Sequence, residues 1–527
     1  MLRKTVSGII LTLLFIGTLT LAFNLRLSGA QPATIVVPDD YRTIQDAINA
    51  AKSGDTVFVR SGIYVESLTV NKAIAIIGEG CETTILDASG YDGIMVFADG
   101  VTLRGFTIKN ADCGVYLESN DNTVTKNIIV NSSYHSIMVV GYKNGGYRNN
   151  ISWNKIISTE ARWGIWIIGG GMNNVVGNII ANHKGHGIYI SPTRTIPVSE
   201  PSRSNIIFNN TIIHNGMGYD ECGIYVENSP NNIIFGNTII GNKETGITIV
   251  LGESKNNTIF ANIIANHECG ISIGSGSDNH TLFENKIINN KRGICIGGKN
   301  CRIFHNNFIN NTIHATASEG ANIWNDYYPS GGNYWSDYDG IDVKTGANQN
   351  QPGSDGIGDT PYIIDAKNRD MYPLIVPWGA IPVIVDGMIY SIGLKSNSTV
   401  HGFEFNQPLM QISFKISGEA GMHGYCNVTV PKTLLKGEPW TVKLNGTNWN
   451  FQSFENETHS FIYFTYTHAS TYHVVIQGTW VVPEFPSTTI LPILMLATLI
   501  ATIVLKKRRK PKTQLAQFFA LFSLPPF

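Results

Sequence analysis

The chain has 527 residues, which exceeds a single ordinary domain, so two or three domains are expected. Its 38 basic and 39 acidic residues leave a net charge of −1 without a basic stripe before the C-terminus, which excludes a nucleic-acid-binding surface. Charged residues are sparse, whereas Gly, Asn and Ile are abundant, and this composition favours a repetitive β architecture over a helical one.

The N-terminus has the composition of a secretory signal peptide. Arg3 and Lys4 precede an apolar run over residues 6–23, and small residues at positions 28–30 offer a cleavage site before Gln31. This pattern predicts a signal peptide over residues 1–30 and therefore export of the chain. The alternative is that the apolar run stays as an uncleaved anchor.

Residues 43–54 are expected to form a short amphipathic helix. Apolar residues fall on one helical face, Thr43 can cap the start with Asp46 three residues on, and Gly54 can end the helix. Short strands are expected next. A helix followed by such strands resembles the N-terminal cap of pectin-lyase-like β-helices, and the resemblance implies that the helix covers the open end, which otherwise exposes edge strands.

A repeat of about 25 residues follows and determines the expected fold. Asn- and Ile-rich segments such as 178–182 and 262–266 each precede a Gly-Ile-x-Ile strand, as at 187–190 and 270–273. One such unit cannot bury its apolar face alone, so the units must stack. The Leu pattern and the 3.6-residue period of leucine-rich or helical repeats are absent. An all-β chain is therefore expected, with a right-handed parallel β-helix over residues 31–318.

One Asn recurs at the same corner of each predicted coil. Asn tolerates left-handed backbone conformations, and its amide can bond to the amides above and below it. The repeat therefore predicts a structural ladder made of Asn127, Asn154, Asn178, Asn210, Asn237, Asn262, Asn285 and Asn306.

The residue x of each Gly-Ile-x-Ile strand is expected to point outward, because the flanking apolar residues point inward. This position is large in the first half of the solenoid and small in the second half. Aromatic faces can stack on sugar rings, and carboxylates can accept hydrogen bonds from sugar hydroxyls. The sequence thus predicts a glycan-binding surface of Tyr116, Trp166, Tyr189, Tyr225, Glu118 and Glu227. The alternative is that neighbouring rings stack on one another and only stiffen the sheet.

A second column consists of phenylalanines two residues before the repeating Asn. Five consecutive coils carry it, at Phe208, Phe235, Phe260, Phe283 and Phe304. A bare apolar stripe of this size is unusual on a soluble surface, so we expect the following β module to pack against it. The alternative is that the rings stack on one another.

Beyond the last clear coil, specific motifs lie at Asn333–Asp339, Asp355–Tyr362 and Asp370–Leu374. With these motifs and the repeats, residues 34–376 resemble the family of the copper-associated periplasmic protein NosD. We assign residues 319–378 to this Trp-, Tyr- and Asp-rich end of the β-helix. The resemblance implies carbohydrate binding or hydrolysis and, in one branch of the family, copper delivery.

Five acidic residues in this segment make Ca²⁺ the one cofactor that the residues themselves indicate, because hard oxygen ligands suit this ion. Asp in Gly-rich turns is also often purely structural, which is the alternative. The candidate ligands are Asp337, Asp339, Asp342, Asp355 and Asp359. For copper, His183 and His267 hold equivalent positions with two coils between them, about 14 Å apart, so they cannot share one ion.

The rest of the chain is expected to contain a β module and an anchor. Residues 379–480 alternate apolar and polar residues and predict a β-sandwich that serves as a spacer or in adhesion. Residues 481–487 form a linker, residues 488–505 an apolar helix long enough to span a bilayer, and residues 506–527 a cytoplasmic tail that begins with a basic cluster.

Pro-Glu-Phe-Pro at residues 483–486, the apolar helix and the basic cluster together resemble the PEF-CTERM sorting signals of archaeal surface proteins. The resemblance implies removal of the helix by an archaeosortase and transfer of the protein to a lipid. The tail continues to Phe527, beyond the usual early stop of such signals.

Cysteines and glycosylation sequons fit an exported protein. None of the 7 cysteines forms a CxxC pair, which argues against zinc, and the odd number leaves at least one thiol unpaired or paired between molecules. Asn-x-Ser/Thr sequons begin at Asn131, Asn150, Asn209, Asn256, Asn279, Asn310, Asn397, Asn427, Asn445 and Asn456.

These features predict a single-pass cell-surface protein that binds carbohydrate or mediates adhesion, with a glycan and the membrane as partners and no nucleic acid. The first alternative is a polysaccharide-processing enzyme, either a lyase, a hydrolase or an epimerase. No aligned acid–base pair is evident in the repeats, so catalytic residues stay unidentified. The second alternative is a copper-associated accessory protein of the NosD type.

Overall fold

The computed structural model describes residues 32–142, 145–158, 160–193, 200–216, 221–318, 320–385 and 388–482. The predicted signal peptide, membrane helix and cytoplasmic tail lie outside these residues, as does most of the 481–487 linker. No helix within the described ranges has the length and apolar character needed to cross a bilayer.

The described chain forms two compact units. The solenoid unit comprises the residues up to Asp326 together with Gly331–Asp339 and Thr360–Pro373, and the two-sheet unit comprises Tyr327–Ser330, Gly340–Asp359 and the residues from Leu374. The segments at 327–330 and 340–359, which the sequence analysis assigned to the end of the β-helix, thus belong to the second unit.

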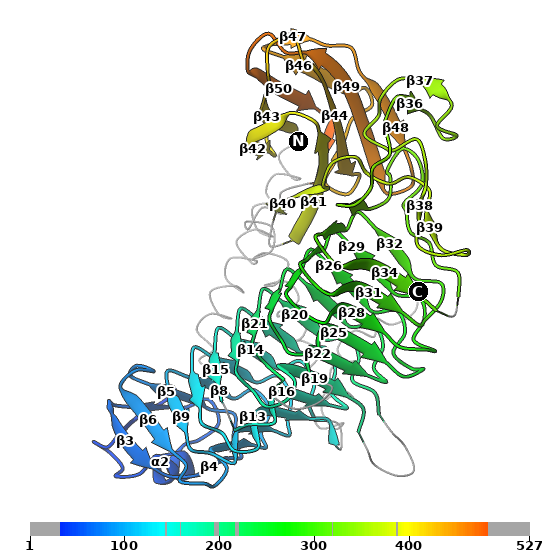
Figure 1. Ribbon diagram of the computed structural model, residues 1–527. Helices are drawn as coiled ribbons and strands as arrows, with labels where there is room; N and C mark the ends of the chain where they lie inside the picture. Colours follow the sequence, from blue (N-terminus) through cyan, green and yellow to red (C-terminus); the bar gives the residue numbers. More distant parts are fainter. Residues whose placement is uncertain are drawn as a thin grey trace, which may run out of the picture. The chain divides into compact units, whose positions relative to one another are not determined.

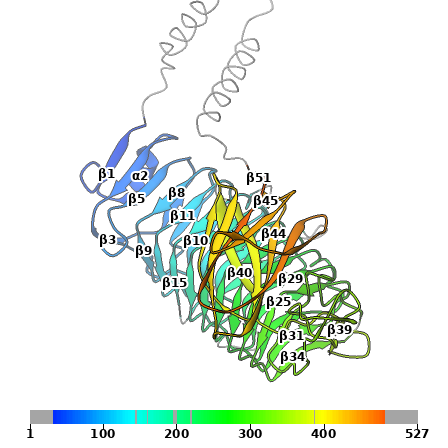
Figure 2. The same cartoon turned by 90° about the horizontal axis from the view of Figure 1, so that it is seen from above.

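The solenoid is a right-handed parallel β-helix with three long sheets, as expected. Successive coils stack in chain order, from the blue N-terminal coil to the green C-terminal coil in Figures 1 and 2. Sheet 1 consists of β1 (Thr34–Val37), β2 (Thr56–Val59), β5 (Ala75–Gly78), β8 (Thr102–Arg104), β11 (Thr123–Thr125), β14 (Asn150–Ser152), β17 (Asn174–Val176), β20 (Ile206–Phe208), β23 (Ile233–Phe235), β26 (Thr258–Phe260), β29 (Thr281–Phe283) and β32 (Arg302–Phe304).

Sheets 2 and 3 form the other two faces. Sheet 2 consists of β4 (Leu68–Val70), β7 (Ile94–Val96), β10 (Cys113–Leu117), β13 (His135–Val140), β16 (Trp163–Ile168), β19 (Ile188–Ser191), β22 (Cys222–Glu227), β25 (Thr245–Val250), β28 (Cys269–Ile273), β31 (Arg292–Ile296) and β34 (Ile313–Ala317). Sheet 3 consists of β3 (Gly62–Val65), β6 (Thr84–Asp87), β9 (Thr107–Lys109), β12 (Ile128–Val130), β15 (Lys155–Ile157), β18 (Ile179–Ala181), β21 (Thr211–Ile213), β24 (Thr238–Ile240), β27 (Ile263–Ala265), β30 (Lys286–Ile288), β33 (Asn307–Ile309) and β35 (Tyr334–Trp335).

Helix α2 (Ile44–Ala50) packs against the first strands of sheets 1 and 2. The Thr43 side chain accepts a hydrogen bond from the Asp46 amide, as predicted. The carboxylate of Glu66 also accepts the Ile44 and Gln45 amides, at 2.9 and 3.0 Å, so an acidic group faces the helix N-terminus. The helix ends at Ala50, four residues before Gly54.

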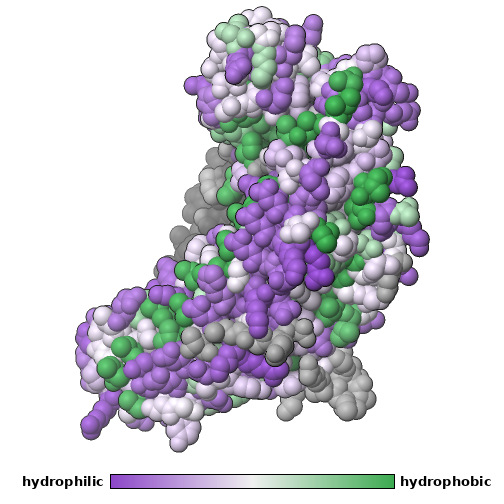
Figure 3. All heavy atoms as spheres, viewed as in Figure 1, coloured by the Kyte–Doolittle hydropathy of each residue, from purple (hydrophilic) through white to green (hydrophobic). Residues whose placement is uncertain are grey.

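The core of the solenoid is filled by columns of aliphatic side chains. Inward Ile side chains in all three sheets, for example Ile207, Ile212 and Ile224, have no solvent exposure. The outer face shown in Figure 3 is mostly hydrophilic over the solenoid, with hydrophobic side chains in separate small groups. The alternation of buried and exposed positions therefore follows the period-2 pattern of the sequence.

The predicted Asn ladder lies at the corner between sheets 1 and 3, where its side chains are buried. At Asn237, for example, the side-chain Nδ2 donates to Asn262 Oδ1 at 3.0 Å and to the Ile207 carbonyl at 2.9 Å, while its Oδ1 accepts from the Asn210 backbone amide. The ladder continues through Asn333 and ends on the buried carboxylate of Asp370. This NosD-like Asp is thus a structural cap, a role that the sequence analysis did not assign.

Two further ladders fill the other corners and were missed from the sequence. Asn122, Asn149, Asn173, Asn205, Asn232 and Asn257 form the ladder between sheets 2 and 1. Asn215, Asn242, Asn290 and Asn311 form the third, which also includes His183 and His267. These two histidines replace Asn in a hydrogen-bonded column, which supplies a structural reason for their equivalent positions.

The phenylalanine column stacks ring on ring along sheet 1. The four centroid separations between consecutive rings run from 4.3 to 5.4 Å, and the interplanar angles are 14° or less. The rings are half-buried. Stacking, the alternative in the sequence analysis, is therefore present, and packing of the second unit on this column stays a prediction.

The two-sheet unit has two five-stranded antiparallel sheets that share one core. Sheet 4 consists of β40 (Gly379–Val385), β41 (Met388–Ser396), β44 (His423–Pro431), β49 (His459–Thr467) and β48 (Gln452–Glu455), and sheet 5 of β42 (Thr399–Asn406), β43 (Gln411–Ser417), β50 (Tyr472–Gln477), β46 (Thr441–Leu444) and β47 (Thr447–Asn448). Three short strand pairs complete the described strands: β36 (Lys344–Thr345) with β37 (Gln351–Pro352), β38 (Tyr362–Ile363) with β39 (Arg369–Asp370) in the solenoid unit, and β45 (Leu435–Lys436) with β51 (Trp480–Val481).

Candidate functional site

The residues of the predicted glycan-binding surface lie in one column on the outer face of sheet 2. Tyr116 pairs with Met138, Met138 with Trp166, Trp166 with Tyr189 and Tyr189 with Tyr225 on consecutive strands. These strands, β10 to β22, include the longest of the solenoid, and most of them are labelled in Figure 1. Parallel stacking therefore brings together side chains that are more than 100 residues apart in sequence.

A second column of rings flanks the first and was missed from the sequence. His135, Trp163 and His186 each stand three residues before the outward residue x of their own strand. The Trp163 ring stacks on His135 at 4.8 Å and on His186 at 6.3 Å. Their common spacing from the Gly-Ile-x-Ile strands was the available signal. We call the two columns together the aromatic patch: Tyr116, His135, Trp163, Trp166, His186, Tyr189 and Tyr225.

The two columns interlock. Trp166 and Tyr189 are nearly parallel at 5.7 Å, and Trp163 meets both of them edge-on at 4.4 and 4.6 Å. The Tyr225 ring stacks on His186 at 4.5 Å. Tyr189 is only 3% exposed, whereas Tyr116, Trp166 and Tyr225 are partly exposed. Ligand contact is therefore open to the latter three rings, and Tyr189 supports them from within.

Polar atoms of the patch are positioned by neighbouring side chains. The Tyr116 hydroxyl donates to Glu118 at 2.8 Å, and the Tyr189 hydroxyl donates to Glu227. Trp166 Nε1 donates to the Ser191 hydroxyl at 2.9 Å. Each predicted carboxylate is thus anchored by a tyrosine hydroxyl, which fixes the carboxylate beside an aromatic ring.

Burial keeps the imidazoles of the patch neutral. Desolvation, together with the nearby Arg162 guanidinium, lowers the pKa of His135 to about 4 and the pKa of His186 to about 3. The Arg162 guanidinium lies 4.5 Å from the Trp163 ring centroid. A carboxylate oxygen of Glu221 lies 3.8 Å from His186 Nδ1, which accepts the Cys222 amide. The patch therefore joins neutral imidazoles, phenol–carboxylate pairs and one cation.

The five aspartates proposed for Ca²⁺ do not form one ligand set. Asp337 and Asp339 belong to the solenoid unit, whereas Asp342, Asp355 and Asp359 belong to the two-sheet unit. No cluster of three or more His, Cys, Asp or Glu side chains suited to a metal occurs within the described ranges. The aspartates split because the chain crosses between the two units within this segment.

These carboxylates instead accept hydrogen bonds from backbone amides and side chains of the protein. Asp342 accepts from the amides of Asp355 and Gly356 at 3.1 and 2.8 Å, and Asp359 accepts from the Lys344 amide at 3.0 Å. Asp337 accepts from the Tyr362 hydroxyl at 3.2 Å. Their hydrogen bonds support the structural alternative of the sequence analysis.

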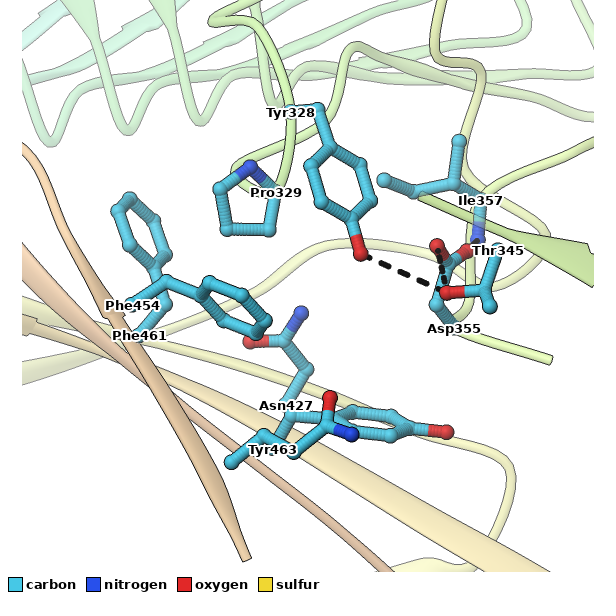
Figure 4. A pocket seen from close by; sticks show the side chains of 10 residues that line it. Tyr328, Pro329, Thr345, Asp355, Ile357, Asn427, Phe454, Phe461 and Tyr463 are labelled. Atoms are coloured by element: carbon cyan, nitrogen blue, oxygen red, sulfur yellow. Dashed lines mark hydrogen bonds between the residues drawn. The ribbon is translucent and has the colours of Figure 1, made fainter. Parts of the chain in front are cut away.

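Asp355 lies in a polar pocket of the two-sheet unit. Its carboxylate accepts from the Thr345 hydroxyl at 2.9 Å, and Thr345 also contacts the Tyr328 hydroxyl at 3.4 Å, as Figure 4 shows. Burial raises the pKa of Asp355. Nearby, the fully buried Lys395 donates to the Ser330 carbonyl at 3.0 Å. These contacts hold the 327–330 and 340–359 segments against sheet 4.

The solenoid matches two protein families in sequence. Residues 92–259 match the family described as "Right handed beta helix region", and residues 198–340 match the family described as "Periplasmic copper-binding protein (NosD)". A curated relative, a cell surface glycoprotein of Methanothermus fervidus, is 27% identical over 436 residues, which cover 77% of this chain and 67% of the relative.

Solved structures with similar folds share little sequence with this chain. An alginate lyase from Paenibacillus sp. str. FPU-7 has 16% identity and a TM-score of 0.38, over 48% of this chain and 94% of the lyase. The catalytic domain of a GH87 alpha-1,3-glucanase has 13% identity and a TM-score of 0.42, over 57% of this chain and 70% of the glucanase. With its stacked parallel coils and its two family matches, the chain is a right-handed parallel β-helix protein whose later coils resemble those of NosD.

Proposed function

We propose that this protein binds carbohydrate at the cell surface, with the glycan lying along the aromatic patch of sheet 2. The observation that carries the proposal is the register that aligns Tyr116, Trp166 and Tyr225 on one outer face, with Glu118 and Glu227 beside them. Partly exposed rings supply stacking area, and tyrosine-bonded carboxylates supply acceptors for sugar hydroxyls. An extended glycan matches a column that runs across several coils.

A surface location rests on two supports. One relative, with 27% identity, is a cell surface glycoprotein. The predicted signal peptide and membrane helix would place the described residues outside the cell on a single-pass anchor. Anchoring through this helix, or through a lipid after archaeosortase processing, is part of the proposal.

Glycan retention by substituted proteins tests the patch. Trp166→Ala with Tyr225→Ala removes two partly exposed rings, so the affinity for a glycan identified on an array should fall at least about tenfold. Phe235→Ala is the matched control, because it removes a stacked, half-buried ring from sheet 1. Equal glycan affinity in the double variant and the control would remove the patch as the binding site.

A polysaccharide-processing enzyme is the second candidate, and one observation favours it. The patch contains a partly exposed phenol, Tyr116, whose hydroxyl is bonded to the partly exposed carboxylate of Glu118. Such groups can exchange protons with a substrate. Release of new chain ends from uronate polymers, lost in Tyr116→Phe and Glu118→Gln, would establish catalysis. If neutral and uronate polymers are bound but not cleaved, binding is the only function that the patch supports.

A further inference from the structure

A large open cleft lies in the two-sheet unit, independent of the aromatic patch. Its volume is about 800 Å³, and it lies between the segment at 345–354 and the outer face of sheet 4. Volumes of this order are typical of small-molecule sites. The lining residues are Thr345, Pro352, Gly353, Ser354, Asn397, His423, Gly424, Tyr425, Trp449, Gln452, Tyr463, Thr465, Tyr466 and Thr467.

The composition of this lining restricts the ligand. Among the described residues it contains no Asp, Glu, Lys or Arg, and its one imidazole among them, His423, contacts the Thr467 hydroxyl at 3.1 Å. The described part of the lining also contains no Leu, Ile, Val, Met or Phe. A charged ligand would find no opposite charge there, and a lipid or an apolar peptide would find no aliphatic wall. Hydroxyl, amide and aromatic groups together suit a neutral molecule rich in hydroxyl groups.

Aromatic rings of the cleft are held in place by hydrogen bonds. Trp449 is 36% exposed, and its Nε1 donates to the Thr465 carbonyl at 2.9 Å. The Tyr463 hydroxyl donates to the Ser354 carbonyl across the cleft, and the Tyr463 ring borders the neighbouring pocket in Figure 4. The exposed indole therefore has a fixed orientation, which lowers the entropy lost when a ligand stacks on it.

We propose that this cleft binds a short neutral oligosaccharide, with one sugar ring stacked on Trp449 and sugar hydroxyls bonded to Gln452 and Thr465. The two-sheet unit then has a binding role of its own beyond that of a spacer. Because no charged group takes part, binding is insensitive to salt, unlike recognition of a uronate polymer.

Oligosaccharide binding by the full chain tests the cleft. Neutral gluco- and manno-oligosaccharides are compared with uronate oligosaccharides at low and high salt. Trp449→Ala should weaken binding of a neutral oligosaccharide at least about tenfold. Trp480→Ala is the matched control, because Trp480 is 40% exposed in the same unit and outside the cleft. Thr465→Val removes a lining hydroxyl and keeps the side-chain volume, so it tests the site even if Trp449→Ala fails to fold.

The outcomes separate this site from the aromatic patch. Binding that Trp449→Ala and Thr465→Val weaken, and that the Trp166/Tyr225 double variant leaves unchanged, supports the cleft. Neutral binding that neither cleft variant changes overturns it, and so does binding restricted to uronates. If only the Trp166/Tyr225 double variant loses oligosaccharide binding, the ligand binds at the aromatic patch. That result overturns the cleft and leaves the function proposed for the solenoid intact.

An independent observation concerns two cysteines on neighbouring coils of sheet 2. The sulfur atoms of Cys269 in β28 and Cys295 in β31 are 3.0 Å apart, about 1 Å longer than a disulfide bond. Cys269 is buried, and Cys295 is partly exposed. Hydrogen bonds from Cys269 and Thr316 and the positive charge of Arg292 lower the pKa of Cys295, so the accessible thiol is also the one that ionises first.

We infer that Cys269 and Cys295 form a disulfide that joins two coils. The Cys295 thiolate attacks one sulfur of an external low-molecular-weight disulfide and releases one thiol. The Cys269 thiol then loses its proton and attacks the Cys295 sulfur of the mixed disulfide, which releases the second thiol. Two protein thiols are oxidised, and the external disulfide is reduced to two thiols.

Peptide mapping of the full chain without reductant tests the bond. After thiols are blocked with N-ethylmaleimide, trypsin should yield residues 256–286 linked to residues 293–299, and reduction should separate them. Cys295→Ser should abolish the link. Cys222→Ser is the matched control, because the Cys222 thiol contacts the Thr248 hydroxyl at 3.1 Å in the equivalent geometry. Both thiols blocked after treatment with oxidised glutathione, or Cys295 linked to another molecule, would overturn the inference.

Discussion

Buried asparagines at the corners of the solenoid bond to both neighbouring coils. The side chain of Asn237 contacts Asn210, Asn262 and the Ile207 carbonyl, and it is about as buried as any aliphatic residue of the core. An amide suits this position because it donates and accepts along one line, so each ladder residue satisfies the next. A side chain without both functions leaves buried groups unpaired.

The ladder is sensitive to a single charge. Asn237→Asp replaces the Nδ2 donor with a carboxylate oxygen facing the Ile207, Phe235 and Asn262 oxygens. The free energy of unfolding of the solenoid should fall by about 3–5 kcal/mol, because an unpaired charge is buried. Denaturant unfolding measures this. Asn256→Asp, at an exposed turn, should change stability little; equal losses in both variants would contradict the structural role of the ladder.

Buried histidines should make the solenoid sensitive to acid. Burial lowers the pKa of both His183 and His267 from 6.5 to about 4. Below pH 6.5 the unfolded chain therefore binds protons that the folded chain excludes, so stability falls as the pH drops from 6.5 towards 4. Each histidine contributes about 1.4 kcal/mol per pH unit in this window.

Asparagine at these positions should remove part of the acid sensitivity. His183→Asn with His267→Asn keeps a ladder-forming amide in the column, so the loss of stability between pH 7 and pH 5 should shrink in denaturant unfolding. The control His401→Asn changes an exposed residue of the two-sheet unit and should leave the pH dependence of the solenoid intact. An unchanged pH dependence in the double variant would assign the acid sensitivity to other groups.

At the scale of the element, the glycine before each outward-facing strand position allows the coils to approach closely. A Cβ on Gly246 would lie 2.6 Å from the Gly270 carbonyl oxygen and 2.6 Å from Ile264 Cγ2. Equivalent glycines at positions 223 and 270 are equally crowded. The Gly-Ile-x-Ile pattern therefore reflects strand stacking at a tight corner, where any side chain would push two coils apart.

Gly246→Ala tests this close approach. The added methyl meets backbone and a core side chain, so unfolding should require about 3 kcal/mol less free energy. Gly252→Ala is the matched control, because its nearest atom would lie 3.9 Å away in an open turn. The comparison uses chemical denaturation of both variants, and equal stability would show that the corner can relax.

At the scale of the whole molecule, the sequons are distributed over the surface with one exception. Asn427 lies in β44 and is 3% exposed, whereas Asn131, Asn209, Asn256 and Asn279 lie in exposed turns. If the chain is exported through a glycosylating pathway, glycans should occupy exposed sequons and be absent from Asn427. Glycopeptide mass spectrometry measures this, and a glycan on Asn427 would mean that modification precedes folding.

Surface topology has its own test. Protease added to intact cells should degrade the described residues, and the same treatment should leave a cytoplasmic marker protein intact. The proposed orientation places all of them outside, upstream of the basic cluster at residues 506–510. Full protection of the chain would contradict this orientation.

The sequence by itself determined the solenoid, one Asn ladder and the outward column from Tyr116 to Tyr225. These features repeat at a constant spacing, and a parallel stack converts constant spacing into spatial alignment without any further information. Features with irregular spacing leave no such alignment in the sequence. The third ladder was missed because His183 and His267 interrupt its Asn residues, and the His135–Trp163–His186 column because it precedes the strand pattern. The second ladder is an uninterrupted run of Asn from Asn122 to Asn257 and could have been found.

Only the tertiary structure decided which of these side chains meet at each site. It paired Tyr189 with Glu227 across two coils, placed Cys269 against Cys295, and divided the five aspartates between two units. It also formed the cleft around Trp449 from a loop and strands that are distant in sequence. The physical reason is that side-chain contact depends on rotamers, coil-to-coil offsets and the path of irregular loops. None of these produces a periodic pattern in the amino-acid sequence.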